Sequence, residues 1–245
     1  MATDQNDLEK MAYAAAWSLP LMMSPLPLVQ QALDALEQMA RAQLAALYNN
    51  MLGRLRSLSD SLWTGQISAA QFRAEMNSLI RQSYGSAATY GRYAAHDIQS
   101  PSAAETFSVA EQVRAELKYA DNLVNQYENQ EVSRSKFNAR LDMYPGAVAE
   151  VFNRSWATHT ETNVFRWRMS EGAQHCIACL EAAGGSGKDR PAGQYSLAEL
   201  PFYPGRSPVC LDNCMCFLIA DNGRRSAPAV RAPAGNVPSR VNTEG

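Results

Sequence analysis

All five cysteines of this 245-residue chain lie between positions 176 and 216, and their spacing constrains the fold more than any other feature. Two form a Cys-x-x-Cys pair, and three follow residues 180–209 as Cys-x-x-x-Cys-x-Cys. Thiolates spaced in this way can converge on one tetrahedral ion, and Zn²⁺ suits them because it is borderline-soft. We expect a structural zinc site, which contributes folding free energy on the order of 10 kcal/mol to a segment poor in core residues.

Four ligand positions leave one of the five cysteines over. The spacing predicts Cys176 and Cys179 as one pair of metal ligands, and Cys210 and Cys214 as the other. Cys216 is the alternative ligand, because side chains two apart on a strand over residues 214–220 point to the same face. The sequence therefore leaves open which of the last three cysteines is spare.

Other interpretations of the cysteines stay open beside the metal site. His175 and His159 are candidate substitutes for a thiolate ligand. The cysteines could also form disulfides or lie buried as thiols, but an odd number confined to one segment is less typical of a disulfide scaffold. A redox Cys-x-x-Cys is a third interpretation, although no thioredoxin-like βαβ pattern surrounds it.

Composition and missing motifs argue against enzymatic chemistry and against a general DNA-coating surface. The chain is 46% hydrophobic, so it can build a core, and its net charge of −2 is not that of a basic, nucleic-acid-coating protein. Residues 184–188 resemble a phosphate loop, but Asp189 stands where Ser or Thr is needed and no strand-to-helix frame surrounds it. Nucleophile elbow, zincin and dinucleotide motifs are absent. We expect no enzymatic activity.

The first 28 residues are expected to form an extended apolar arm. Residues 11–29 carry no charged side chain, but Pro20, Pro25 and Pro27 would interrupt a membrane-spanning helix. The acidic residues that precede them are unlike the positive start of a signal peptide. The arm would lie on a partner's surface, or equally on this chain's own core. No membrane association is expected.

A helical body is predicted over residues 29–160. From Val29 to Leu62 apolar residues recur at steps of three and four that repeat every eleven residues, which keeps one stripe nearly straight and predicts another long helix as partner. Further helices follow, and two of them begin with capping boxes at Ser68 and Ser102. Pro145 is placed to begin another helix. The fold class is therefore mainly α, with long antiparallel helices.

Residues 161–221 are expected to form a small Cys-rich module. Phe165, Trp167 and Met169 alternate with other residues at the strand period, and residues 214–220 are the natural antiparallel partner. A β-hairpin beside a Cys₄ site would be zinc-knuckle-like. The tail over residues 222–245, rich in Pro, Gly and Arg, cannot bury enough surface to order itself. We expect both termini to dock on neighbouring proteins.

The C-terminal third resembles the head-morphogenesis, or minor head, proteins of tailed bacteriophages, the Mu F-like group. That family typically has a Trp-bearing strand, a Cys-x-x-Cys, a Gly-rich spacer, a Pro-Gly turn and an Asn-Cys-Arg-Cys-like ending. Met215 stands where the family usually has Arg. The resemblance covers about residues 160–220. The matching residues are Trp167, Cys176, Cys179, Gly184, Gly185, Leu200, Pro201, Pro204, Gly205, Cys210, Asn213, Cys214 and Cys216.

The resemblance implies a structural virion protein, assembled in the host bacterial cytoplasm and acting in head assembly. Its partners would be other phage structural proteins, namely portal, major capsid or neck proteins, in a multimeric assembly. A zinc-ribbon nucleic-acid-binding module is the alternative, because Arg166, Arg168, Lys188, Arg190 and Arg206 lie near the expected knuckle. The mild overall charge does not favour it. A Cys-x-x-Cys thiol enzyme is the second alternative.

Overall fold

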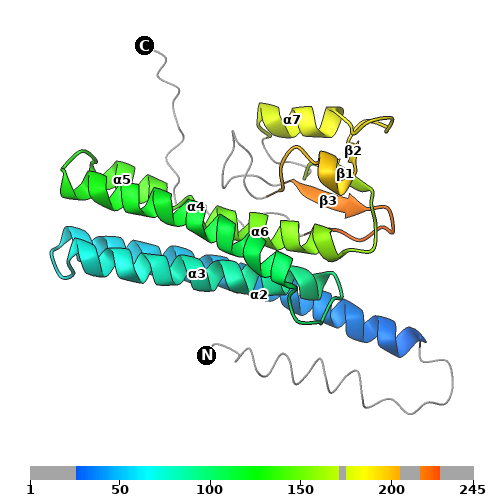
Figure 1. The fold of residues 1–245 in the computed structure, drawn as a ribbon, viewed down its shortest axis with the longest axis horizontal. Coiled ribbons are helices and arrows are strands. Elements are labelled where there is room, and N and C mark those ends of the chain that lie inside the picture. The colour runs from blue at the N-terminus through cyan, green and yellow to red at the C-terminus, as the bar shows by residue number, and fades with distance from the viewer. Residues whose placement is uncertain (1–25, 171–174, 205–215, 227–245) are drawn as a thin grey trace.

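The computed structural model describes residues 26–170, 175–204 and 216–226. These residues are mainly helical, as expected, and the long helices lie side by side along the molecule's long axis, with α7 and the strands on the α6 side (Figure 1). The elements are α2 (Leu26–Trp63), α3 (Ala69–Ala94), α4 (Ala103–Glu128), α5 (Arg134–Leu141), α6 (Tyr144–His159), β1 (Phe165–Arg168), α7 (Ile177–Gly184), β2 (Gln194–Tyr195), the 3₁₀ turn η1 (Leu197–Glu199) and β3 (Phe217–Ala220).

The helix boundaries follow local chemistry that the sequence displays. The Ser68 and Ser102 side chains each accept a hydrogen bond from the third helical backbone N–H, and the Gln71 and Glu105 side-chain oxygens accept one from the backbone N–H of the cap residue. Both predicted capping boxes are thus confirmed. Gly65 has φ of +72°, the left-handed conformation that ends the turn after α2.

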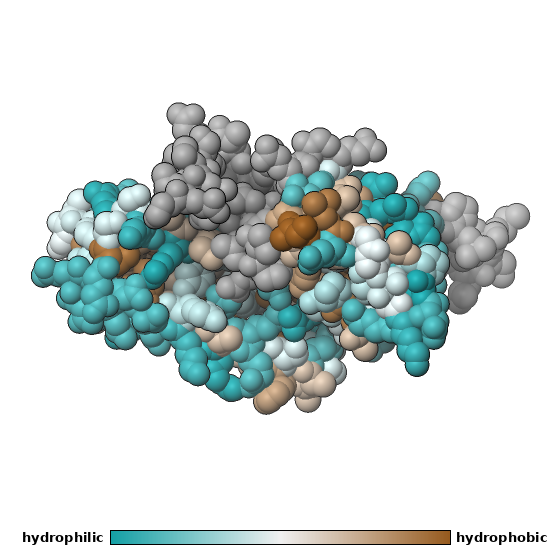
Figure 2. Space-filling model, turned by 90° about the horizontal axis from the view of Figure 1, so that it is seen from above, coloured by the Kyte–Doolittle hydropathy of each residue, from teal (hydrophilic) through white to brown (hydrophobic). Residues whose placement is uncertain are grey.

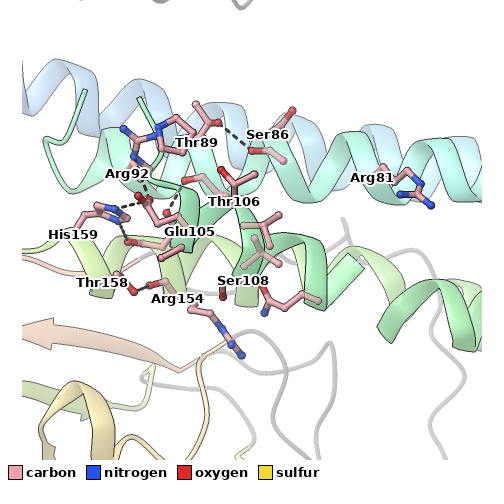
Figure 3. Close-up of a pocket in the computed structure, with 18 of the residues that line it drawn as sticks. Arg81, Ser86, Thr89, Arg92, Glu105, Thr106, Ser108, Arg154, Thr158 and His159 are labelled. Atoms are coloured by element: carbon pink, nitrogen blue, oxygen red, sulfur yellow. Dashed lines mark hydrogen bonds and ion pairs between the residues drawn. The ribbon is translucent and has the colours of Figure 1, made fainter. Parts of the chain in front are cut away.

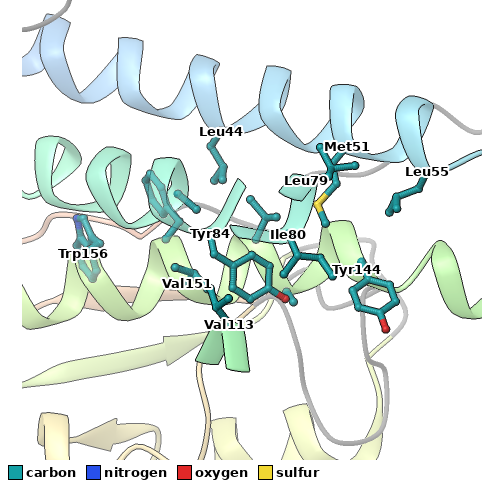
Figure 4. Close-up of a cluster of buried hydrophobic side chains, with 14 of the residues drawn as sticks. Leu44, Met51, Leu55, Leu79, Ile80, Tyr84, Val113, Tyr144, Val151 and Trp156 are labelled. Atoms are coloured by element: carbon teal, nitrogen blue, oxygen red, sulfur yellow. The ribbon is translucent and has the colours of Figure 1, made fainter. Parts of the chain in front are cut away.

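The apolar stripe of α2 packs on a second long helix, as its period predicts. Leu44, Met51 and Leu55 of α2 face the α3 side chains Leu79 and Ile80 (Figure 4). Helix α6 adds Val151 and the fully buried Trp156 to the same cluster. Burying one large apolar side chain contributes about 1.5–3 kcal/mol, so this cluster is the main source of stability of the helical body.

Helices α3 and α6 approach closely because one contact position is glycine. A Cβ on Gly91 would clash with the Phe152 carbonyl oxygen, and it would lie 2.8 Å from the Ser155 Cβ and 3.0 Å from the Trp156 backbone nitrogen. The Ser155 hydroxyl donates a hydrogen bond of 2.7 Å to the Ala88 carbonyl. Glycine at position 91 therefore allows α3 and α6 to pack closely.

The strands form a sheet in the order β2-β1-β3, with both pairings antiparallel. Trp167 of β1 pairs with Leu218 of β3, which confirms the expected pairing of these two segments. The expectation of a two-stranded hairpin is wrong, because β2 pairs with the other edge of β1. The sheet joins the helical core through Phe165, whose ring centroid lies 5.9 Å from that of Trp156.

The spacer after the cysteine pair is more ordered than a Gly-rich loop. Helix α7 occupies its first part, because its Leu, Glu and Ala residues are strong helix formers. Gly193, at φ of +73°, lets the chain pass so close to α7 that a Cβ there would lie 2.9 Å from the Ala183 carbonyl oxygen. The Tyr195 hydroxyl then donates a 2.7 Å hydrogen bond to the Ala182 carbonyl, which ties α7 to the sheet.

Arg224, just beyond β3, fastens the sheet to the helical body. Its guanidinium donates hydrogen bonds to the Ala94 and Ala95 carbonyls at the C-terminus of α3, where a positive charge is favourable. It also lies 3.4 Å from a Glu37 carboxylate oxygen of α2. The sheet therefore contacts both long helices through one side chain.

The predicted terminal segments fall mostly outside the described residues. Residues 1–25 of the expected arm and residues 227–245 of the expected tail are not described. Helix α2 begins at Leu26, so the last residues assigned to the arm are helical. Among the helices of the described ranges, none combines the length and the apolar character needed to cross a membrane.

Candidate metal centre

The Cys-x-x-Cys pair opens a helix. Cys176 is the N-cap of α7, with extended backbone angles, and Cys179 lies in the first turn. Both residues therefore lie at the N-terminal end of the helix. Cys176 is half-buried and Cys179 is buried. The cysteine pair thus forms the start of α7, because helix-forming residues follow it directly.

Cys216, from the second cysteine cluster, lies beside His175, the residue before the first cysteine pair. It directly precedes β3 and is fully buried. Its Sγ lies 3.8 Å from Nδ1 of His175, the residue before Cys176. Pairing of β1 with β3 produces this approach, because it brings the start of β3 beside the chain that leaves β1.

The hydrogen bond of His175 orients its ring toward the sulfur. Its Nε2 lies 2.9 Å from the Ser170 carbonyl oxygen, and since a carbonyl only accepts, Nε2 carries the proton. In the neutral ring, Nδ1 then presents its lone pair toward Cys216 Sγ. Metal-binding imidazoles are usually oriented in this way, with the second nitrogen donating to a carbonyl or carboxylate.

The described residues contain half of the expected ligand set. Cys176 and Cys179 are placed, whereas Cys210 and Cys214 lie outside the described ranges. Within those ranges no group of three or more Cys, His, Asp or Glu side chains is close enough to hold a metal ion. The thiols and the imidazole nevertheless have the chemistry that Zn²⁺ prefers.

Hydrogen bonds and ring contacts hold the strands beside this centre in place. The Leu218 backbone of β3 donates a 2.8 Å hydrogen bond to the Ser226 hydroxyl, and the Ser226 backbone donates one of the same length back to the Leu218 carbonyl. Trp167 is buried and packs edge-on against Phe202 at 4.7 Å between ring centroids. The two segments that carry the cysteines therefore adjoin strands that are held in place.

The outer face of α7 is apolar and exposed. Ile177 is 59% exposed and Leu180 is 47% exposed, and both follow the metal-ligand candidate Cys176 on the same short helix. Figure 2, which views the molecule from above, shows a patch of strongly hydrophobic side chains on this face, with hydrophilic ones beside it. Neighbouring apolar side chains that are exposed on a helix are typical of a contact surface.

The remaining candidate residues lie elsewhere. His159 lies at the end of α6, where its ring nitrogens contact the Glu105 carboxylate and the Ser155 carbonyl oxygen. Arg166 and Arg168 occupy the exposed face of β1. Arg190 is 3.4 Å from a Glu199 carboxylate oxygen, so its charge is partly neutralised.

Comparison of the chain with family models, with curated proteins and with solved structures finds no match. The function must therefore be argued from the residues themselves. The sequence alone marked His175 only as a substitute ligand. Its orientation by the Ser170 carbonyl depends on how the chain turns after β1, which no motif reveals.

Proposed function

We propose that this chain is a non-enzymatic structural protein of a tailed-phage particle, a minor head protein that acts at the portal vertex or in head assembly by docking on other virion proteins. One observation carries the proposal: His175, beside the first cysteine pair, meets Cys216 of the second cluster at 3.8 Å. The approach of two distant cysteine segments supports a metal-fastened module, and the spaced motifs around it are those that resemble the minor head family.

In this proposal the metal is structural. Cys176, Cys179, Cys210 and Cys214 would hold Zn²⁺, with Cys216 as the alternative ligand. The ion would supply positive charge and tetrahedral geometry, and a thiolate-rich set leaves no open position for catalysis. The chain's own contribution is to hold the start of α7 against the sheet, which the Tyr195 hydroxyl does through the Ala182 carbonyl.

The docking surface would be the exposed face of α7. Ile177 and Leu180 lie within one turn of the cysteine pair, so a metal that fixes the helix start would also fix these side chains. A preorganised apolar patch binds with a smaller entropy cost than a mobile one. The partners we propose are portal, major capsid or neck proteins, met in the host cytoplasm where the virion assembles.

The test measures metal and docking separately. Elemental analysis of the purified protein, read with a count of free thiols, should find about one zinc per chain, and removing it with a chelator should lower the unfolding temperature. The double variant Cys176→Ser, Cys179→Ser should lose the metal and also particle incorporation. A metal-free protein of unchanged stability would refute the structural zinc site.

A matched variant on the same helix isolates the docking surface. Ile177→Ser with Leu180→Ser alters exposed side chains only, so the zinc content and the unfolding temperature should stay near those of the wild type. Incorporation into phage heads, measured by complementation and by blotting of purified particles, should fall. Normal incorporation of this variant would show that α7 is not the docking surface.

A zinc-ribbon nucleic-acid-binding module is the second candidate. Arg166 and Arg168 both project from the exposed face of β1, where they could meet two phosphates. Filter binding with a steep salt dependence, lost in the variant Arg166→Gln with Arg168→Gln, would favour this function.

A thiol enzyme is the third candidate, favoured by the position of Cys176 at the N-cap of α7. Helix N-termini stabilise thiolates, which are the reactive form of cysteine. Reduction of insulin disulfides by the purified protein would support this activity, and tightly bound zinc that blocks the thiols would count against it.

A further inference from the structure

A groove of about 600 Å³ lies between α3, α4 and α6, away from the cysteines and His175. Its volume is within the range of small-molecule sites. Figure 3 shows Arg92, Glu105 and His159 gathered at one end, Arg81 at the other, and Arg154 on the α6 side. The groove therefore runs along α3 for about three helical turns, or roughly 16 Å.

The floor of the groove is kept open by a glycine that helix packing does not require. A Cβ on Gly85 would meet no atom within 4 Å, whereas one on Gly91 of the same helix would clash with α6. Glycine is a poor residue for a helix interior. Apolar groups line the rest of the floor, including Ala88, Val109 and Val151.

The wall of the groove is positively charged. Arg81, Arg92 and Arg154 line it with a single carboxylate, that of Glu105. Glu105 is already engaged, because it accepts a 2.7 Å hydrogen bond from the Ser102 backbone and lies 2.6 Å from His159 Nε2. Arg154 is ion-paired with Glu150, 2.8 Å away and outside the lining, so Arg81 is the arginine of the groove that no carboxylate of the described residues balances.

The arginines offer more donors than the protein has acceptors. Arg92 is 3% exposed, and its Nε and Nη2 have no hydrogen-bond acceptor among the described residues. The carboxylates of Asp97 and Glu105 lie 3.6 Å from Nε, which is beyond hydrogen-bonding distance. The buried Nε of Arg154 likewise has no acceptor there.

Arg81 is the cation best placed for direct contact. It is exposed, and it forms no hydrogen bond or ion pair with any residue that the structure describes. The hydroxyls of Ser86 and Ser108, which also line the groove, are similarly uncommitted within the described chain. A guanidinium beside free hydroxyls can bind a carboxylate or a phosphate with charge-assisted hydrogen bonds.

We propose that this groove binds a small amphipathic anion, with its hydrocarbon part over Gly85 and Val151 and its carboxylate or phosphate group at Arg81. The apolar floor matches the hydrocarbon part and the arginine-rich wall matches the negative charge. The site is independent of the proposed role in the phage particle.

Titration calorimetry with decanoate, decyl phosphate and decanol tests the chemistry directly. The two anions should bind saturably with a Kd below about 1 mM, and the alcohol at least tenfold more weakly. Whichever of the carboxylate and the phosphate binds more tightly identifies the head group. Equal binding of decanol would overturn anion recognition, and no saturable binding of either anion would overturn the site.

Two glycine variants test the location of the site. Gly85→Leu places a side chain in the groove without a backbone clash, so the fold should be retained while the affinity for the anions falls at least tenfold. Gly53→Leu is the matched control, because Gly53 is also helical and unobstructed but lies on α2, outside the groove. Unchanged binding by Gly85→Leu would rule the groove out.

A charge variant tests the head-group position. Arg81→Gln removes the positive charge but keeps a polar, shorter side chain, so it should weaken anion binding roughly tenfold while leaving any weak binding of decanol unchanged. A change of the same size for the anions and the alcohol would contradict a head group at Arg81.

Discussion

His159 Nε2 lies 2.6 Å from Glu105 Oε1, and this contact joins the end of α6 to the first turn of α4. The other nitrogen of the ring, Nδ1, lies 2.7 Å from the Ser155 carbonyl oxygen. Since a carbonyl and an ionised carboxylate only accept, both contacts are hydrogen bonds when the ring is an imidazolium. Glu105 therefore has two roles: it completes the capping box of α4 and it is the partner of His159 on α6.

Replacing Glu105 should expose both of these roles. Burial alone would raise the pKa of Glu105, but hydrogen bonds from Ser102 and the nearby positive charges of His159 and Arg92 lower it below 4.5. Glu105→Ala removes the cap partner and the acceptor of His159, so the free energy of unfolding should fall by about 1–2 kcal/mol. Urea unfolding at neutral pH measures this loss.

Two controls separate the roles of Glu105. Gln can still complete a capping box, so Glu105→Gln should lose less stability than Glu105→Ala, and the remaining loss reports the charge. Glu111→Ala, at an exposed ion pair with Arg114 on the same helix, should change stability by less than about 1 kcal/mol. Equal losses in the Glu105→Ala and Glu111→Ala variants would contradict the double role.

The capping box of Ser102 and Glu105 can be predicted from the sequence, but the contact between Glu105 and His159 cannot. Ser102 and Glu105 are three residues apart, so their chemistry is local and appears directly in the sequence. His159 is joined to Glu105 only because α6 and α4 both pack near the end of α3. For the same reason the groove beside this pair was not predicted, since it is lined by three helices and has no motif.

In the sheet, too, some features could be predicted from the sequence and others could not. The alternation of Phe165 and Trp167 with arginines predicted β1, and the continuous apolar run over residues 217–220 predicted β3 as its partner. Strand β2 was missed because it is two residues long and lies in a Gly-rich segment. Helix α7 was missed because its residues are helix formers, but a cysteine pair at its start and glycines at its end are also typical of a metal-binding loop.

Glu199 should make the spacer between the cysteines sensitive to acid. Its carboxylate accepts hydrogen bonds from the Ser196 hydroxyl and backbone and from the Lys188 backbone, which lower its pKa from 4.5 to about 2. A carboxylate with a lowered pKa stabilises the folded state above pH 4.5, and this contribution is lost as the pH falls toward about 2.

The variant Glu199→Gln tests this acid sensitivity. It should reduce the pH dependence of the unfolding midpoint between pH 4.5 and about 2, followed by circular dichroism. Glu181→Gln, on the exposed side of α7, is the control and should leave the dependence unchanged. The prediction would be wrong if both variants showed the wild-type dependence.

Gly91 should tolerate no side chain, whereas Gly85 on the same helix should. An added methyl at Gly91 clashes with the Phe152 carbonyl of α6, so Gly91→Ala should lower the free energy of unfolding by about 1–3 kcal/mol. Gly85→Ala meets open space and should raise it by up to about 1 kcal/mol, because alanine favours the helix. Urea unfolding should show changes of opposite sign in the free energy of unfolding of the two variants. Changes of the same sign would contradict this packing of α3 on α6.

His96 should make the protein less stable in mild acid. Burial, assisted by the nearby charge of Arg224, lowers the pKa of His96 below 6.5, although Glu37 and Asp34 oppose the shift. The unfolded chain then binds a proton at a higher pH than the folded chain does. Stability therefore falls as the pH drops below 6.5, until the folded-state pKa is passed.

The backbone at His96 dictates the variant that tests this effect. Its φ is +68°, a left-handed conformation that Asn adopts more readily than most residues, so His96→Asn removes the titrating group with little strain. Between about pH 7.5 and about pH 5.5, wild-type stability should decline more steeply than that of His96→Asn. Parallel declines in urea unfolding would mean that other groups cause the acid sensitivity and that the His96 contact with Glu37, 3.8 Å away, keeps the folded ring as basic as the unfolded one.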